Sequence, residues 1–176
     1  MLPRLLKVAG LGISLSVFAA TPPAPELHFP SITADTLSKQ TLHLPQDFGT
    51  ADSLVVLAFE RDQQKDLDSW AKPAQDLATA SPPLRFYEVP VFPWRDVFYR
   101  WWLNTAMRSS MADDAARRRT IPVYVNKEKF EASLQIMTEK AITVVLLDKD
   151  GRVLWRTSGP WNEEKGRALA FAVTHS

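Results

Sequence analysis

Residues 143–170 read TVVLLDKDGRVLWRTSGPWNEEKGRALA, and this stretch is the most informative about the fold because it predicts two strands and a helix in succession. Residues 144–147 form a continuous apolar run, which is typical of a strand covered on both faces. Asp150-Gly151 follows this run, and glycine supplies the positive φ of a tight turn without steric cost. We therefore expect the second strand to pair antiparallel with the first.

The second strand and the helix of this unit carry their own signals. Alternation over residues 152–156 predicts that Val153 and Trp155 share a buried face, with Leu154 on the opposite, mixed face. Asn162 can cap the helix that follows, and the acidic residues after it suit the positive end of the helix dipole. The residues expected to pack this helix on the sheet are Leu169, Phe171 and Val173. Together these elements predict a C-terminal ββα unit.

Similar patterns precede this unit along the chain. Residues 53–59, SLVVLAF, form a second continuous apolar run and are predicted to be the central strand. Residues 66–79 place apolar side chains at helical spacing, but Pro73 removes one backbone hydrogen bond, so we expect a bent helix or two short helices. Residues 29–44 suggest a small hairpin or an edge strand. The pattern is that of an α/β fold.

The middle of the chain contains an aromatic segment between two strands. Residues 84–91 predict a strand in which Pro90 indicates an edge position or the exit of the strand. Residues 94–111 are helical in spacing and so rich in aromatic residues that their side chains cannot all face one core. We expect residues 113–119 to form a charged loop. The remaining expected elements are a short strand at 121–125 and a short helix at 127–136.

Composition excludes several classes of function. The 176 residues are enough for one domain with a core of its own. The 21 basic and 20 acidic residues give a net charge of +1, which disfavours nucleic-acid binding. The absence of cysteine excludes thiol redox chemistry and any thiolate metal site in this chain. The three histidines do not have metal-ligand spacing, so we expect neither a metal nor another cofactor.

The N-terminus has the features of a leader. Residues 1–20 combine a basic start, a short apolar segment and small residues, which predicts a signal peptide cleaved after Ala19 or Ala20. Residues 21–26 form a Pro-rich spacer, and the domain is expected to span residues 27–176. We therefore expect an exported, periplasmic protein. If the leader is not cleaved, the alternative is a protein anchored in the inner membrane.

The order of the elements, namely strand, kinked helix, strand, helix and a ββα close, resembles the thioredoxin-like fold, a central mixed β-sheet flanked by helices. In that fold the redox cysteines lie where the first central strand meets its helix, which is residues 61–64 here, Arg-Asp-Gln-Gln. A cis-proline usually precedes the strand that corresponds to residues 143–147, where this chain has Ala141-Ile142. The resemblance implies a thioredoxin-like scaffold without thiol chemistry, carrying an aromatic-rich helical insertion.

Within that fold the chain resembles the mitochondrial ATP synthase assembly factor family known as subunit ten of the ATPase complex. The resemblance extends over residues 29–170 as a pattern and is most specific in the C-terminal part. The residues that carry it are Ile121, Pro122, Tyr124, Leu134, 145–148, 151–155, Ser158, Gly159, Glu163, Glu164 and Leu169, with Ser69, Trp70 and Pro73 in the first helix. Members of that family are regarded as non-catalytic helpers in assembly of the membrane sector of the synthase, so the resemblance implies an assembly role.

Two groups of residues are candidates for a partner site. Clustered aromatic residues that are exposed mark protein interfaces or contact with a membrane surface, and the candidates are Trp94, Phe98, Tyr99, Trp101 and Trp102. A basic run can bind an acidic partner or an anionic lipid head group, and it consists of Arg117, Arg118 and Arg119. Both groups also have a structural interpretation, as core aromatics and as a solvated loop. Trp155 between two arginines is either a core residue or a recognition surface.

These observations favour a redox-inactive binding protein over an enzyme. We predict an assembly factor or chaperone that binds a protein partner, in particular a membrane-associated complex, through the aromatic helix. The alternative is a protein that binds a small ligand, or an enzyme without a thiol, with polar groups near residues 61–64 forming the pocket. No catalytic residue is predicted, since the chain has no Ser-His-Asp set, phosphate loop or dinucleotide motif.

Overall fold

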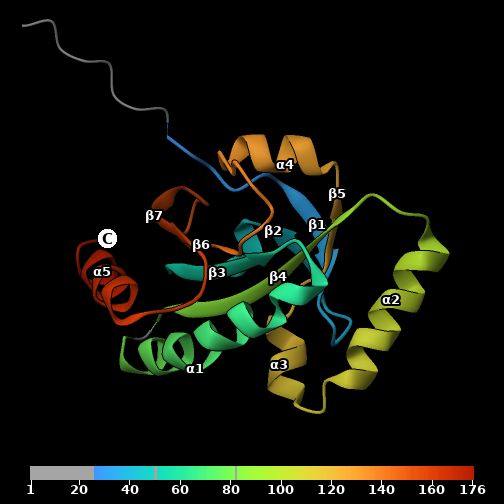
Figure 1. The fold of residues 1–176 in the computed structure, drawn as a ribbon, viewed down its shortest axis with the longest axis horizontal. Helices are drawn as coiled ribbons and strands as arrows, with labels where there is room; N and C mark the ends of the chain where they lie inside the picture. The colour runs from blue at the N-terminus through green and yellow to red at the C-terminus, as the bar shows by residue number, and fades with distance from the viewer. Residues whose placement is uncertain (1–25, 50, 82) are drawn as a thin grey trace, which may run out of the picture.

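A mixed five-stranded sheet with helices on both faces forms the centre of the molecule (Figure 1). It is seen in a computed structural model that describes residues 26–49, 51–81 and 83–176. The strands are β3 (Ser53–Ala58), β4 (Arg85–Pro93), β5 (Val123–Val125), β6 (Thr143–Leu147) and β7 (Val153–Ser158), in the order β5-β4-β3-β6-β7. Strands β3, β4 and β5 are parallel, whereas β6 is antiparallel to both β3 and β7. The predicted mixed α/β sheet is confirmed.

A hairpin and the helices complete the architecture. The hairpin joins β1 (Ile32–Asp35) and β2 (Thr41–Leu44), as the hairpin interpretation of residues 29–44 predicts. The α-helices are α1 (Gln64–Ala80), α2 (Val97–Ser110), α3 (Asp114–Arg119), α4 (Lys127–Ser133) and α5 (Glu163–Thr174), and the short 3₁₀ helices are η1 (Gln46–Phe48) and η2 (Arg61–Gln63). Figure 1 shows α4 and α1 on opposite sides of the sheet, with α2 at the edge of the molecule.

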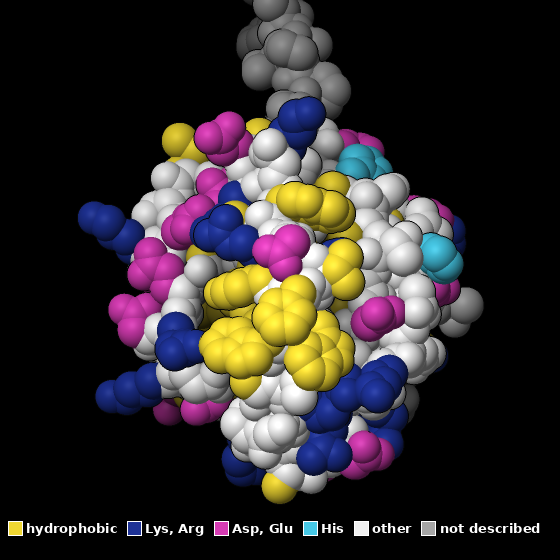
Figure 2. Space-filling view, turned by 90° about the vertical axis from the view of Figure 1, so that its right-hand side faces the viewer, with side chains coloured by type: hydrophobic (Ala, Val, Ile, Leu, Met, Phe, Trp, Pro, Cys, Tyr) yellow, Lys and Arg dark blue, Asp and Glu magenta, His cyan; other side chains and the backbone are white. Residues whose placement is uncertain are grey.

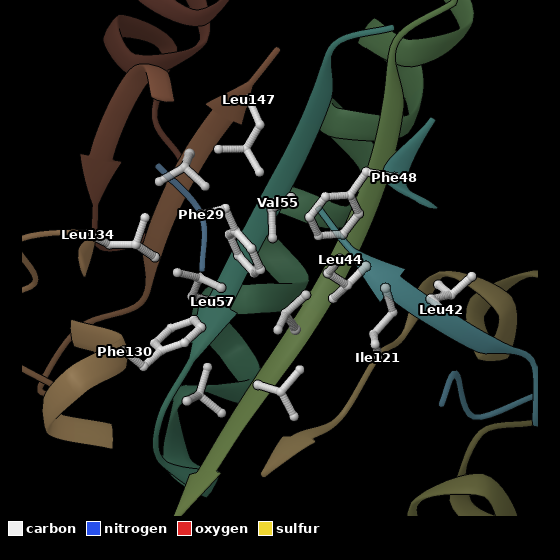
Figure 3. Close-up of a cluster of buried hydrophobic side chains, with 14 of the residues drawn as sticks. Phe29, Leu42, Leu44, Phe48, Val55, Leu57, Ile121, Phe130, Leu134 and Leu147 are labelled. Carbon is white, nitrogen blue, oxygen red and sulfur yellow. The ribbon is translucent and has the colours of Figure 1, made fainter. Parts of the chain in front are cut away.

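Alternation along the two central strands divides the core into two layers. In β3, Val55 and Leu57 face one side, while Leu54 and Val56 face the other, and all four are fully buried. The first layer lies under the hairpin and α4, and Figure 3 shows its aromatic residues: Phe29 packs edge-on against Phe48 and Phe130. The second layer lies under α1 and α5 and consists of Leu54, Val56, Leu67, Trp70, Ala74, Leu84, Phe86, Ile142, Val144, Leu146 and Leu169. Burial of both faces explains the continuous apolar runs.

The C-terminal unit forms the predicted two strands and helix, but the register of β7 differs from the prediction. Gly151 has φ +83°, and its amide donates to the Asp148 carbonyl at 3.0 Å, which closes the expected turn. Leu146 pairs with Trp155 and Leu147 pairs with Val153, so Leu154 is an extra residue in a β-bulge. The prediction that Val153 and Trp155 share a face is therefore wrong, because the bulge turns Val153 to the first layer and Trp155 to the second.

Of the two alternatives predicted for residues 66–79, the structure has the single helix, because α1 continues through Pro73. Three other local predictions are corrected. Pro90 lies within β4, an inner strand that continues to Pro93, and the proline is neither at an edge nor at the exit. The expected charged loop at 113–119 contains α3, because the Asp113 carboxylate accepts the first amides of that helix. Phe171 does not pack on the sheet, since it lies on the exposed side of α5.

Candidate functional site

The segment that corresponds to the redox site of the thioredoxin-like fold is held by a buried amide, that of Gln63. The Gln63 Oε1 atom accepts hydrogen bonds from the amides of Phe59 at 2.8 Å and Glu60 at 3.3 Å. Its Nε2 donates to the carbonyl oxygen of Glu139, in the loop that precedes β6. The two loops that frame the redox site of this fold are therefore joined by a neutral side chain, which supplies no nucleophile.

A lysine and two carboxyl groups, Lys127, Glu131 and Glu139, lie beside this bridge. Lys127 forms an ion pair with Glu139, and its Nζ lies 5.7 Å from the centre of the Phe59 ring. Burial, followed by the neighbouring Glu139 carboxyl, raises the pKa of Glu131 to about 7. Burial alone would raise the pKa of Glu139 as well, but hydrogen bonds with Glu131 and Lys127 outweigh it and lower that pKa. Glu131 is therefore the member of the pair that holds a proton toward neutral pH.

A cavity of about 330 Å³ lies between this segment and the inserted helix α2. Its volume is at the lower end of the range for small-molecule sites. The wall is mainly apolar, with polar groups of Glu60, Arg61, Gln64 and Ser110 at the rim. The apolar lining consists of Ala58, Phe59, Leu67, Pro90, Phe92, Leu103, Ala106 and Met107. The carboxyl pair does not line this cavity, so the structure does not place the perturbed acid in it.

The aromatic residues predicted as a partner site are gathered on one exposed surface. Figure 2 shows a hydrophobic cluster on the face of the molecule that carries α2. We call Trp94, Phe98, Tyr99, Trp101 and Trp102 the aromatic surface. Four of its side chains are between 52% and 73% exposed, and Tyr99 is 40% exposed. The sequence prediction that some of these aromatic residues are exposed is confirmed, and all five are.

Helix α2 is held to the rest of the molecule by its opposite side. Leu103 is the buried residue of this helix. Asn104 accepts a hydrogen bond from the Tyr124 hydroxyl at 2.8 Å, and Arg108 Nε donates to the Leu37 carbonyl at 2.5 Å. The Asp96 carboxylate caps the helix by accepting from the Tyr99 amide at 2.9 Å. Anchoring on one side leaves the aromatic surface turned to solvent.

The three arginines of the basic run lie in the last turn of α3 and contact the chain itself. Arg117 donates to the Met111 carbonyl at 2.7 Å, and Arg118 pairs with Asp114 on the same helix. Arg119 turns toward the sheet, where its Nε lies 3.3 Å from the buried carboxylate of Glu88. Burial raises the pKa of Glu88, and Arg119 and Thr120 partly counteract that rise.

Trp155 lies at the second core layer, half-buried, with its ring centre 6.4 Å from that of Trp70. Of the two interpretations left open by the sequence, this placement favours the core residue. Its neighbour Arg156 is directed to the carbonyl oxygens of Leu134 and Gln135.

Sequence reasoning missed the residues whose roles depend on distant partners. Gln63 and Glu139 are 76 positions apart, and Glu88 and Arg119 are 31 apart, so no local spacing marks these contacts. The signal that was available is a charged residue, Glu88, inside an apolar strand. Among the described residues, no group of three His, Cys, Asp or Glu side chains is arranged to hold a metal ion. No helix in the described ranges is long and apolar enough to cross a bilayer.

Comparison with known proteins supports the fold. No family model matches the chain, and no curated protein matches it. Among solved structures it is similar to BsSco, described as a member of the Sco family of cytochrome c oxidase assembly proteins, with a TM-score of 0.59 and 14% identity over 86% of this chain and 96% of that one. A secreted thiol-disulfide isomerase from Corynebacterium glutamicum matches with a TM-score of 0.55 and 16% identity, over 90% of this chain and 97% of that one.

A thiol:disulfide interchange protein from Bacteroides sp. matches with a TM-score of 0.55 and 15% identity, over 86% of this chain and 91% of that one. The structural similarity establishes the thioredoxin-like fold, and at identities this low it establishes no family or function. The chain thus has the scaffold of thiol-disulfide proteins while its own sequence contains no cysteine.

Proposed function

We propose that this thioredoxin-like protein acts by binding a protein partner through the aromatic surface, as an exported assembly factor or chaperone for a membrane-associated complex. The observation that carries the proposal is the solvent exposure of five clustered aromatic side chains, four on α2 and one, Trp94, in the segment that precedes this helix. A soluble domain gains stability by burying such side chains. Aromatic residues that stay exposed together are the composition expected of an interface.

The placement of this surface supports a binding role. Helix α2 is an insertion anchored by Leu103, Asn104 and Arg108, so the aromatic side chains of its outer side contribute little to the core. Trp and Tyr are also the residue types that most often dominate the energy of protein interfaces. Of the basic run, the exposed Arg118 would border the contact, where charged side chains affect the rate and specificity of association more than its strength, whereas Arg117 and Arg119 contact the chain itself.

The assembly role rests on two likenesses. The sequence resembles an ATP synthase assembly factor family, and the similar BsSco structure is described as that of a member of a family of oxidase assembly proteins. Export rests on the leader pattern of residues 1–20 and the Pro-rich spacer of residues 21–26, of which residues 1–25 lie outside the described residues. N-terminal sequencing of the protein from a periplasmic fraction tests this part: a start after Ala19 or Ala20 supports cleavage, and an intact leader in membranes supports the anchored alternative.

Affinity capture tests the partner site. The chain from residue 21 onward is used to capture partners from detergent-solubilised membranes after mild crosslinking, and the captured proteins are identified by mass spectrometry. Recovery of the subunits of one membrane complex, lost when Trp101 and Trp102 are both changed to alanine, supports the proposal. Phe171→Ala is the matched control, because Phe171 is 65% exposed on a different helix. Equal recovery by the double variant and the wild type would refute the proposed surface.

The cavity beside residues 61–64 supports a second candidate, binding of a small apolar ligand. An apolar wall with a few polar groups at its rim is the usual composition of such a site. An apolar fluorescent dye tests it: the dye should bind the wild type and be excluded when Ala106→Trp fills the cavity. If the dye binds both proteins equally, the cavity is not the site.

A further inference from the structure

A second concave site lies on the other side of α2, between this helix and the β1–β2 hairpin. This groove has a volume of about 870 Å³. Trp94, Trp101 and Arg100 form one side, Thr33 and Asp35 of β1 form the other, and β5 contributes to the lining. Because Trp94 and Trp101 belong to the aromatic surface as well, the groove is continuous with it. A partner bound on that surface would have direct access to the groove.

The groove carries an excess of positive charge. Its charged side chains are Lys39, Arg100, Arg108 and Asp35, which leaves three cations against one carboxylate. That carboxylate already accepts a hydrogen bond from the Thr41 hydroxyl at 2.6 Å. No ion pair within 4.0 Å links the three cations to an acidic side chain in the described part of the chain. A groove with this balance complements an acidic ligand.

Two aromatic rings hold Arg100 in position, and its buried Nε–H group makes no hydrogen bond to the described residues. Its guanidinium carbon lies 5.0 Å from the ring centre of Trp94 and 5.7 Å from that of Tyr124, so the two rings orient it. The Nε atom is buried and has no hydrogen-bond partner among the described residues. Burial raises the pKa of Tyr124 to about 12, so the phenol next to Arg100 is neutral and does not offset its charge. Most buried polar groups are paired, so this unpaired donor distinguishes Arg100 from an arginine satisfied within the fold, and a ligand carboxylate in the groove would complement its guanidinium charge.

We propose that this groove binds an extended acidic polypeptide segment of the partner. Its carboxylates would contact Arg100 and Arg108, and an apolar side chain of the segment would pack against Trp94 and Trp101. The inference rests on the proposed function and specifies the chemistry of the partner. A bilayer surface fits less well, because Arg100 and Arg108 are only partly exposed and line a groove, whereas a planar layer of head groups contacts side chains that are fully exposed.

Selection from a library of random peptides displayed on phage, with the immobilised chain as bait, tests the inference. Enriched peptides should combine Asp or Glu with an aromatic or aliphatic residue. A synthetic copy of the most enriched peptide should bind Arg100→Gln at least about tenfold more weakly than the wild type, and more weakly at high salt. Arg100→Lys should recover part of the loss, since it keeps the charge. Arg167→Gln, an exposed arginine on α5 paired only with Glu163 in the described chain, is the matched control.

Three outcomes would overturn the inference. These are enrichment of peptides without acidic residues, no enrichment at all, and equal binding by Arg100→Gln with an unchanged melting temperature. Binding of phosphatidylglycerol vesicles that depends on Arg100, in the absence of peptide enrichment, would assign the groove to a lipid surface instead. Capture of the membrane complex separates this inference from the proposed function. If Arg100→Gln still captures the complex and the Trp101 and Trp102 double variant does not, the groove proposal fails while the aromatic surface remains the partner site.

Discussion

Replacing Gln63 with alanine should destabilise the protein by removing the bridge between the two loops at the position of the redox site in the thioredoxin-like fold. The side chain is 4% exposed, and it satisfies the Phe59 amide and the Glu139 carbonyl. The alanine variant leaves these two backbone groups without their partner. An unsatisfied buried group costs about 1–3 kcal/mol; the buried Phe59 amide carries most of this cost and the half-buried Glu139 carbonyl adds less, so the loss amounts to about 3 kcal/mol. The Glu60 amide adds little, because Glu60 is exposed and water can replace the bond.

Urea unfolding followed by circular dichroism measures this loss directly. For a domain of this size, about 3 kcal/mol corresponds to a fall of about 6–12 °C in melting temperature. The adjacent Gln64 is the control, since its side chain is exposed and bonds only to Asp68 among the described residues, at 2.8 Å. Gln64→Ala should change the stability by less than about 0.5 kcal/mol. If Gln63→Ala is no more destabilising than Gln64→Ala, the bridge does not stabilise the fold and the reasoning is refuted.

A third variant tests the donor group of the Gln63 side chain separately from its acceptor group. Gln63→Glu keeps an acceptor for the Phe59 amide but places a carboxylate oxygen against the Glu139 carbonyl. At neutral pH this variant should be less stable than the wild type, because two acceptors face each other in a buried place. As the pH falls and the new carboxyl group is protonated, it becomes a donor and the stability should recover. A constant deficit at every pH would show that the donor half of the amide is unimportant.

Three further predictions concern other parts of the fold. Gly151→Ala should lose about 2–4 kcal/mol in urea unfolding, because φ is +83° and the new Cβ would lie 2.4 Å from Pro45 Cγ; a change below about 1 kcal/mol would contradict it. Burial raises the pKa of Glu131 from 4.5 to about 7, so the folded state holds the proton more tightly and stability should fall as pH rises from about 4.5 to about 7. Glu131→Gln should flatten that fall in melting temperature, and an unchanged profile would exclude this carboxyl as its source. Arg119→Met should cost about 3 kcal/mol by leaving the buried Glu88 carboxylate without its cation, and a neutral result would show that Glu88 is protonated in the variant without penalty.

In this cysteine-free thioredoxin-like chain, a polar side chain occupies the position where the fold usually has its redox site. At the junction of β3 and the first helical turn lies the buried side-chain amide of Gln63, which makes three hydrogen bonds to backbone groups. The inserted helix α2 then covers this region on one side, where the 330 Å³ cavity remains, and presents the aromatic surface on the other. The geometry of the scaffold is thus compatible with a binding role that depends on α2 rather than on residues 61–64.

The features that sequence alone determined are those whose cause is local. The apolar runs at 53–59 and 144–147 require burial on both faces, and Asp150-Gly151 requires a turn, so the mixed sheet and its C-terminal hairpin could be predicted. The density of aromatic residues in 94–111 exceeds what one side of a helix can bury, so their exposure could be predicted as well. The absence of cysteine excludes thiol chemistry without reference to any fold.

Tertiary structure alone decided the features that depend on contacts between distant segments. The bulge at Leu154 reverses the faces of β7, because register is set by the pairing partner as well as by the alternation of the strand. Glu88 becomes a buried acid when α3 brings Arg119 to it, and Arg100 becomes a recessed cation when the hairpin closes the groove beside α2. A sequence pattern records which side chains lie along one element. The burial and charge of a site depend on which other elements pack against it, and that is decided when the chain folds.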